Sequence, residues 1–399
     1  MRALQGVRIL ELGNFIAAPT AGKLLAEFGA EVIKVEQPRK GDPIRQWRLE
    51  RGSTSMLWRT LGRNKKSVTI DLSVPAGADL VRQLAGHVDA VLENYRPGKL
   101  ESWGIGPEEL RRHNKNLVVV RISGHGQTGP YRHRPGFGGV AESMGGLRYL
   151  TGYPDLPPTR VGVSIGDSIA GLYAALGVLL GLREADKEGG TGETVDVALT
   201  EAVLSMMESL VPDQSAYGTV RQRLGNATRG VAPTGTYPCL DDDWVVIGGN
   251  SDGIYRRLMT AIGRPDLATD PELQTNPQRW KQEALLNGLI ADWTAQRTLK
   301  EVVKILTAAD VPVGPIYSSV DILNDEQYQT RGMLVERYVE VDGPPQPVLF
   351  PGVVPVLEQM PGEIRWLGPE LGEHTSEVLT DLLGLPSVQI AELRQQGVV

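Results

Sequence analysis

The stretch VRILELGNFIAAPTAGKLLAEFGAEVIKVE, residues 7–36, decides the fold of this chain. It predicts a strand over VRILEL (7–12), a helix over PTAGKLLAEFGA (19–30) that begins at Pro19, and a second strand over EVIKVE (31–36). Two short apolar strands joined by one helix are typical of a right-handed βαβ unit, in which the strands run parallel.

The same alternation continues as far as residue 123. It includes strands at SVTIDL (67–72), VDAVLENY (88–95) and NLVVVRIS (116–123), and helices around ADLVRQLAGH (78–87) and PEELRRHN (107–114). We therefore expect an α/β fold with a doubly wound, Rossmann-like parallel sheet. Such sheets bind ligands beyond the carboxyl ends of their strands, which here are the loops at 13–19, 36–42, 93–99 and 123–130.

The length of the chain and a change in its amino-acid composition predict two domains. A chain of 399 residues exceeds what one hydrophobic core usually covers, and residues 211–235 are polar and rich in turn formers. We expect the first part of a large domain at 1–210 and a smaller α+β domain at 225–325. Residues 326–399, with helices around HTSEVLTDLLGL and VQIAELRQQ, should return to the large domain.

Composition excludes several classes of protein. Hydrophobic residues make up 41% and charged residues 22%, which is typical of a globular chain, and the net charge of −7 argues against nucleic acid as a partner. The single cysteine, Cys239, permits no intrachain disulfide and fits the reducing cytoplasm. Five histidines lack metal-ligand spacing, so we expect no metal. The start resembles no signal peptide, and the longest apolar helix, at 169–182, is too short to cross a membrane.

One carboxylate, Asp167, stands where the apolar run VGVSIGDSIAGLYAALGVLLGL (161–182) changes character. Val161, Val163 and Ile165 alternate like a half-buried strand, whereas the residues after Asp167 follow helical spacing. The backbone dipole and free N–H groups at a helix start would keep Asp167 ionised, as a nucleophile requires. Because Asp is also a preferred N-cap residue, these residues alone leave both roles open.

Two patterns concern phosphate-bearing ligands. SGHGQTGP holds a literal GxGxxG at 124–129, but Pro130 follows where a dinucleotide site needs a helix, so nicotinamide binding is not predicted. Basic side chains that gather around three strand ends favour a phosphate-bearing ligand. They are Arg59, Arg63, Lys65 and Lys66, then Arg39 and Lys40, and finally Arg96 and Lys99.

Long motifs spread over the whole chain resemble the class III CoA-transferases of the CaiB/BaiF type. They are GVRILELGNFIAAPTAGKLLAEFGAEVIKVEQP, LGRNKKSVTIDL, VLENYRPGKLESWGIG, ISGHGQTGPYRHRPGF, VGVSIGDSIAGLYAALGVLLGL, GTGETVDVALTEAV and LGPELGEHTSEVL. The family includes formyl-CoA:oxalate and carnitine CoA-transferases and the related 2-methylacyl-CoA racemases. The resemblance implies an interlocked homodimer, with a small domain inserted into the Rossmann-like one.

The resemblance also implies a mechanism. Asp167 falls on the family's catalytic aspartate, which forms an aspartyl anhydride with the acyl donor and then an aspartyl-CoA thioester. CoA then passes to a free acid, here a small dicarboxylate, with CoA as substrate and no tightly bound cofactor. Gly248 and Gly249, in IGGNSDG, resemble a glycine loop that covers the site in some relatives, although a plain strand-end turn explains them equally well. The implied CoA contacts are Ile16, Ala17, Arg63, Asn64, Lys65, Asn94, Tyr95, Arg96, Arg134 and Phe137.

Two alternatives remain beside the transferase. A 2-methylacyl-CoA racemase needs two proton carriers, and the racemases carry a His-Asp pair where this chain reads Pro-Gly-Phe-Gly-Gly at 135–139. A catalytically silent CoA-binding protein would lack the nucleophile, yet Asp167 is present in its motif. The chain also departs from many relatives at Gln37, where some have a basic residue, and at Phe137-Gly138, where many have Tyr-Asp.

Overall fold

The computed structural model describes residues 2–51 and 54–399. The chain folds into two compact units. The first comprises Met1–Leu147, Arg160–Thr219 and Thr330–Val399, and the second comprises Arg148–Thr159 and Val220–Gln329. The first unit holds every candidate site residue predicted from the sequence except the glycines Gly248 and Gly249.

The first unit is built on a parallel sheet of six strands, which confirms the predicted α/β class. Its strands lie in the order β5-β2-β1-β6-β7-β8, so the order of the chain reverses between β1 and β6. A ligand of a doubly wound sheet binds at this switch point. The strands are β1 (Arg8–Glu11), β2 (Glu31–Glu36), β5 (Lys65–Thr69), β6 (Ala90–Glu93), β7 (Val118–Ser123) and β8 (Thr194–Ala198).

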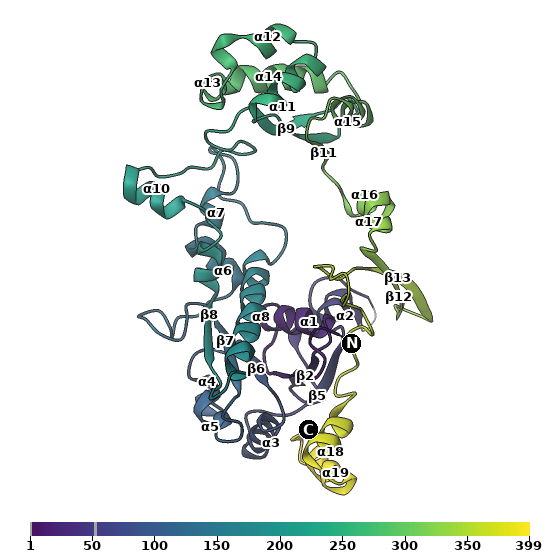
Figure 1. Ribbon diagram of the computed structural model, residues 1–399. Helices are drawn as coiled ribbons and strands as arrows, with labels where there is room; N and C mark the ends of the chain where they lie inside the picture. The colour runs from purple at the N-terminus through teal and green to yellow at the C-terminus, as the bar shows by residue number, and fades with distance from the viewer. Residues whose placement is uncertain (1, 52–53) are drawn as a thin grey trace. The chain divides into compact units, whose positions relative to one another are not determined.

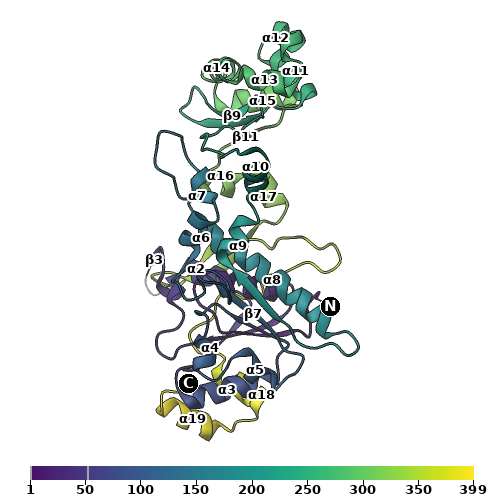
Figure 2. The same cartoon turned by 90° about the vertical axis from the view of Figure 1, so that its left-hand side faces the viewer.

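Helices cover both faces of this sheet because alternate strand residues point to opposite sides. Leu10 and Ile33 face one hydrophobic core, whereas their neighbours Ile9 and Val32 face the other. Figures 1 and 2 show α1 and α8 on one side and α3, α5, α18 and α19 on the other. The first layer holds α1 (Ala17–Glu27), α6 (Gly138–Met144), α8 (Ile165–Ala185) and α9 (Leu199–Leu204); the second holds α3 (Pro75–Ala85), α4 (Lys99–Ser102), α5 (Pro107–Arg111), α18 (Thr375–Leu383) and α19 (Ser387–Gln395).

The first βαβ unit follows the sequence closely, with one difference at the start of the helix. The strand β2 has the predicted bounds, but α1 begins at Ala17, two residues before Pro19. Proline is tolerated there because the first N–H groups of a helix have no partner within it. The helix can therefore begin in the loop that follows β1, and it places Ile16 and Ala17 beside the switch point.

The segment before Asp167 is not a strand, which corrects the prediction for residues 161–165. Ser164 is the N-cap of α8, Ile165 is its first residue, and Val163 is 54% exposed. At 21 residues α8 is also longer than predicted, and by length and composition alone it could cross a membrane. A core helix passes the same test, and α8 buries its small residues against the unit's own core. One of them, Gly171, lies so close to α1 that a side chain would come within 2.8 Å of the Ala17 carbonyl oxygen.

The strand β8 was not predicted, and it completes the sheet beside β7. The tail of the chain adds an antiparallel hairpin, in which Val339 and Phe350 join Ile364 in a small core. The remaining short elements of the first unit are η1 (Pro43–Gln46), β3 (Glu50–Arg51), β4 (Thr54–Ser55), α2 (Met56–Leu61), α10 (Leu210–Tyr217), β12 (Leu334–Glu340) and β13 (Pro345–Pro351). The short helix α7 (Leu147–Leu150) begins at a residue of the first unit, and its other residues belong to the second.

The second unit has its own core around a three-stranded antiparallel sheet in the order β11-β10-β9. Tyr237, Val245 and Leu258 belong to that core, together with the buried thiol of Cys239. The strands are β9 (Thr234–Pro238), β10 (Trp244–Gly248) and β11 (Val313–Pro315). The helices are α11 (Asp252–Ala261), α12 (Pro265–Thr269), η2 (Pro271–Leu273), α13 (Asn276–Lys281), α14 (Glu283–Thr294), α15 (Leu299–Ala308), α16 (Ser319–Asn324) and α17 (Glu326–Thr330).

Candidate active site

A cavity of about 470 Å³ opens at the switch point of the large sheet, and Asp167 lines it. Phe15, Ile16 and Ala17 come from the loop after β1, whereas the loops after β6 and β7 supply most of the other walls. Seven of the ten predicted CoA contacts line this cavity together with Asp167. They are Ile16, Ala17, Asn94, Tyr95, Arg96, Arg134 and Phe137.

Asp167 is the third residue of α8 and not its N-cap, a position that Ser164 holds. Its carboxylate accepts a hydrogen bond from the backbone N–H of Gly138, the first residue of α6. Gly138 must be glycine for this contact to form, because a side chain there would overlap the Asp167 carboxylate. The carboxylate of Asp167, the candidate nucleophile, therefore occupies the space that a side chain at residue 138 would fill.

The surroundings of Asp167 raise the pKa of its carboxyl group to about 6. Burial is the largest cause, and the nearby Glu142 carboxylate adds to it, whereas the Gly138 N–H and Arg160 act in the opposite direction. We expected the helix start to favour the ionised form, but burial outweighs that effect. Most Asp167 side chains are still ionised at pH 7, and the higher pKa makes the carboxylate a stronger base.

Glu142 lies on α6 and is almost fully buried. Its Oε1 is 3.5 Å from the backbone nitrogen of Gly166, the residue before Asp167. Sequence reasoning missed this second acidic residue, because nothing in GFGGVAESMGG indicates that α6 turns it toward the start of α8. Two carboxylates in one enclosed site repel each other, which accounts for the contribution of Glu142 to the pKa of Asp167.

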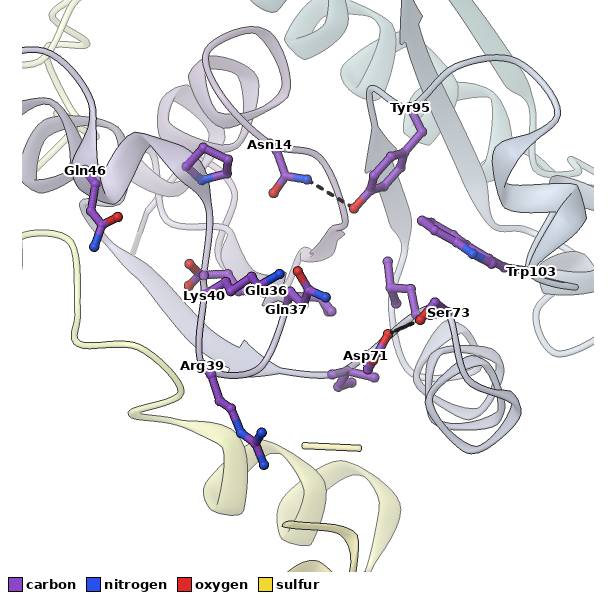
Figure 3. A pocket seen from close by; sticks show the side chains of 15 residues that line it. Asn14, Glu36, Gln37, Arg39, Lys40, Gln46, Asp71, Ser73, Tyr95 and Trp103 are labelled. Atoms are coloured by element: carbon purple, nitrogen blue, oxygen red, sulfur yellow. Dashed lines mark hydrogen bonds between the residues drawn. The ribbon is translucent and has the colours of Figure 1, made fainter. Parts of the chain in front are cut away.

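Hydrogen bonds tie the loops after β1 and β6 to each other. The Asn94 side chain accepts from the Asn14 N–H at 2.8 Å and donates to the Asn14 carbonyl at 2.7 Å. The Asn14 amide donates in turn to the Tyr95 hydroxyl at 3.2 Å, as Figure 3 shows. Asn94 therefore fixes the shape of the cavity as well as lining it. Trp47 and Arg132 complete the lining, and the sequence analysis did not single them out.

Three predicted CoA contacts, Arg63, Asn64 and Lys65, lie away from the cavity of Asp167. All three are buried and none lines the cavity of Asp167. Arg63 pairs with Glu27, Asn64 donates to the Glu363 carbonyl at 2.7 Å, and Lys65 pairs with Glu11 at 2.6 Å. The physical reason is their place at the amino end of β5, because ligands of a parallel sheet bind at the carboxyl ends.

A second cavity, of about 570 Å³, opens beyond the carboxyl ends of β2 and β5. Arg39, Lys40 and Gln37 line it from the loop after β2, and Tyr95 lines both cavities. Figure 3 shows Tyr95 beside Trp103, with Asn14 facing the Tyr95 hydroxyl. The basic residues Arg39 and Lys40 therefore reach this cavity, and Arg96 reaches the cavity of Asp167.

The segment after β7 has no helix until α6 begins at Gly138, so Gly129 does not open one. This confirms that the GxGxxG match is not a dinucleotide fingerprint. His125, in the same segment, lies close to Gly136, because a side chain at Gly136 would come within 3.2 Å of its Nε2 atom. Gly136 lines the cavity of Asp167, but His125 does not. Within residues 2–51 and 54–399, no group of His, Cys, Asp and Glu side chains is arranged to hold a metal ion.

Gly248 and Gly249 belong to the second unit, at the end of β10. A side chain at Gly249 would come within 2.5 Å of the Leu258 side chain, so local packing alone accounts for one of the two glycines. The buried Arg279 holds the next residue by donating to the Asn250 carbonyl at 2.6 Å. That this loop covers Asp167 stays a prediction.

Known proteins share this chain's sequence and fold along its whole length. The family model "CoA-transferase family III" matches residues 4–375. The chain is 47% identical to succinyl-CoA–D-citramalate CoA-transferase of Chloroflexus aurantiacus, over 100% of this chain and 98% of that protein. It is 39% identical to the beta subunit of succinyl-CoA–L-malate CoA-transferase from the same organism, over 99% and 98%. A crystal structure of a CaiB/BaiF family protein from Brucella suis superposes with a TM-score of 0.83 at 30% identity, over 96% and 99%. The chain therefore belongs to CoA-transferase family III and is a CoA-transferase.

Proposed function

We propose that this enzyme moves CoA from a dicarboxylic acyl-CoA to a free dicarboxylate, with Asp167 as the nucleophile. The observation that carries the proposal is the place of the Asp167 carboxylate, in a cavity at the switch point of the sheet. The named substrates of the two similar enzymes, succinyl-CoA with citramalate or malate, support dicarboxylates as the substrate class.

In this proposal, a carboxylate oxygen of Asp167 attacks the thioester carbonyl carbon, and the carbon–sulfur bond breaks to release the CoA thiolate. The thiolate then attacks the Asp167 carbonyl of the mixed anhydride, which frees the donor acid and leaves an aspartyl-CoA thioester. The acceptor acid repeats both steps in reverse. The anhydride and thioester intermediates are all activated acyl groups, so the exchange requires neither a metal nor ATP. The raised pKa of Asp167 strengthens it as a nucleophile.

The Gly138 N–H supports this mechanism as an electrostatic partner of Asp167. It donates to the carboxylate before reaction, so it is aimed at oxygen atoms whose charge changes during attack. Such a fixed backbone donor stabilises a developing oxyanion without having to reorganise. We propose a similar role for the backbone of Gly248 and Gly249 if their loop closes over the site.

We propose that CoA spans the cavity of Asp167 and the second cavity, beyond the ends of β2 and β5. The cavity of Asp167 would hold the thioester and the pantetheine arm, with Ile16, Ala17, Asn94, Tyr95, Arg96, Arg134 and Phe137 as contacts. The second cavity would hold the nucleotide end, where Arg39 and Lys40 can bind phosphates. Tyr95 lines both cavities and marks the passage between them. CoA acts here as a substrate, and we propose no tightly bound cofactor.

Trapping of the acyl-enzyme tests the proposal directly. After the enzyme is mixed with succinyl-CoA, hydroxylamine should convert Asp167 to a hydroxamate that peptide mass spectrometry locates. A 2-methylacyl-CoA racemase or a silent CoA-binding protein would yield no hydroxamate at this residue. Absence of the adduct, with succinyl-CoA bound and the fold intact, would refute Asp167 as the nucleophile.

We also propose that the enzyme is a cytoplasmic homodimer whose subunits interlock, and that its second unit is a domain inserted into the first. An exposed apolar face on α8 supports an association between chains, because Leu172, Leu176, Leu179 and Leu180 are all substantially exposed. The free, buried thiol of Cys239 agrees with a reducing compartment. Both segments that flank the inserted unit, Arg160–Thr219 and Thr330–Val399, belong to the first unit.

A further inference from the structure

We propose that Arg48 binds the free carboxylate at the far end of a dicarboxylic substrate whose other end reacts at Asp167. The inference deepens the proposed function and rests on it, since it names a residue that would select diacids over monocarboxylic acids. The carboxylate could belong to the acyl group of the donor or to the acceptor acid.

Arg48 reaches the start of the helix that carries Asp167. Its Nη2 donates to the Ser164 hydroxyl at 3.0 Å, and Ser164 is the N-cap of α8. Asp167 lies in the first turn of the same helix, so the Arg48 guanidinium is bound beside the turn that carries the candidate nucleophile. The adjacent Trp47 lines the cavity of Asp167, which places Arg48 beside the same opening.

The charge of Arg48 is available to a ligand. Its contacts are the Ser164 hydroxyl and the ring of Trp47, 5.6 Å from the guanidinium, and neither is an anion. In the described part of the chain, no carboxylate forms an ion pair with it. Arg45 shows the contrast, because its guanidinium pairs with Glu36 at 2.7 Å and lies over Trp58.

A dicarboxylic substrate needs a cation beside its second carboxylate, and an arginine without an anionic partner can supply one. One carboxyl group exchanges CoA at Asp167, while the other stays ionised through every step and must not be desolvated without a cation. A guanidinium presents two parallel N–H donors that match the two oxygens of a carboxylate. Donor and acceptor acids react in turn at the same Asp167, so one arginine can serve both halves of the reaction.

The test compares substrates that differ only in the second carboxylate. Succinyl-CoA and butyryl-CoA are the donors, each tried with glutarate and with pentanoate as the acceptor. The variants are Arg48→Gln, which removes the charge, and Arg48→Lys, which keeps the charge without the paired donors. Arg112→Gln is the matched control, because Arg112 is an exposed arginine at the C-cap of α5 and lines neither cavity.

We expect Arg48→Gln to lower kcat/KM by at least about tenfold with the dicarboxylic substrates, since a charge-assisted pair is lost. Turnover of butyryl-CoA with pentanoate should stay unchanged, which also shows that the variant folds. Arg48→Lys should lose less, and Arg112→Gln nothing. A loss limited to succinyl-CoA or to glutarate supports the inference and identifies which carboxylate Arg48 binds.

An equal loss with all four substrate pairs, or no loss with any, would overturn the role of Arg48. A wild-type enzyme that shows no preference for diacids would overturn it as well, while leaving CoA transfer through Asp167 intact. The proposed function fails separately, if the wild-type enzyme transfers CoA between none of these acids.

Discussion

A single methyl group at Gly138 should disable the enzyme without unfolding it. In Gly138→Ala, the new Cβ would lie 2.6 Å from Cγ of Asp167 and 3.0 Å from its Oδ1. Carbon atoms in contact lie about 3.5–4.0 Å apart, so the carboxylate must move by about 1 Å. A displacement of that size at a reacting group can lower the rate by about a hundredfold. We therefore expect kcat for CoA transfer to fall by about two orders of magnitude.

The binding of CoA should survive this change, because Gly138 is not among the residues that line either cavity. Isothermal titration with CoA, steady-state transfer from succinyl-CoA and thermal unfolding separate affinity, rate and stability. Gly162→Ala is the matched control, since a side chain at Gly162, five residues before Asp167, would meet no atom within 4 Å. If Gly138→Ala keeps its kcat within about twofold of the wild type, the position of the Asp167 carboxylate does not limit catalysis.

Five further outcomes can be measured on the same protein. Asp167→Ala should abolish transfer and hydroxamate formation while CoA still binds, and near-normal turnover would exclude covalent catalysis by this residue. Activity should decline as the pH falls through about 6, because Asp167 must be ionised. Glu142→Gln removes a neighbouring negative charge and should move that acid limb to lower pH, and an unmoved limb would contradict the coupling. Arg63→Ala leaves the buried Glu27 with Lys23 as its remaining cation and should cost about 1–3 kcal/mol in urea denaturation, whereas unchanged stability with a raised KM for acyl-CoA would support a role in phosphate binding. Ultracentrifugation at nanomolar concentration should show a dimer, and compact active monomers would contradict interlocking.

The elements predicted best from the sequence are those whose periodicity is set by the core. The strand β2 alternates its apolar residues between the two cores of the sheet, and it has the bounds that its sequence predicts. The alternation at Val161, Val163 and Ile165 misled the prediction because no sheet lies there. Val163 is exposed, and Ile165 already belongs to α8. The pattern of three side chains is too short to separate these cases.

The role of a charged residue was harder to predict than the place of a strand. Arg63 and Lys65 were expected to bind phosphates because basic residues gather near a strand end. Their partners, Glu27 and Glu11, come from distant segments of the chain, and only the folded sheet brings each pair together. Asp167 was predicted as the nucleophile from its motif and lines a cavity at the switch point, but its neighbour Glu142 carried no such signal.

Buried charges around β1 also contribute to the site, through the loop that follows this strand and the start of α1. Lys34 donates to the Gly13 carbonyl at 2.8 Å and pairs with Asp42, which accepts from the Phe15 N–H at 3.1 Å. Lys65 donates to the Pro19 carbonyl at 2.8 Å. The loop is thus held at three points, and it keeps Phe15 in the left-handed region with a φ of 63°. Strain of this kind persists only where the surroundings hold it in place. Because this loop also forms a wall of the Asp167 cavity, the ion pairs beneath it fix the shape of the site before any substrate arrives.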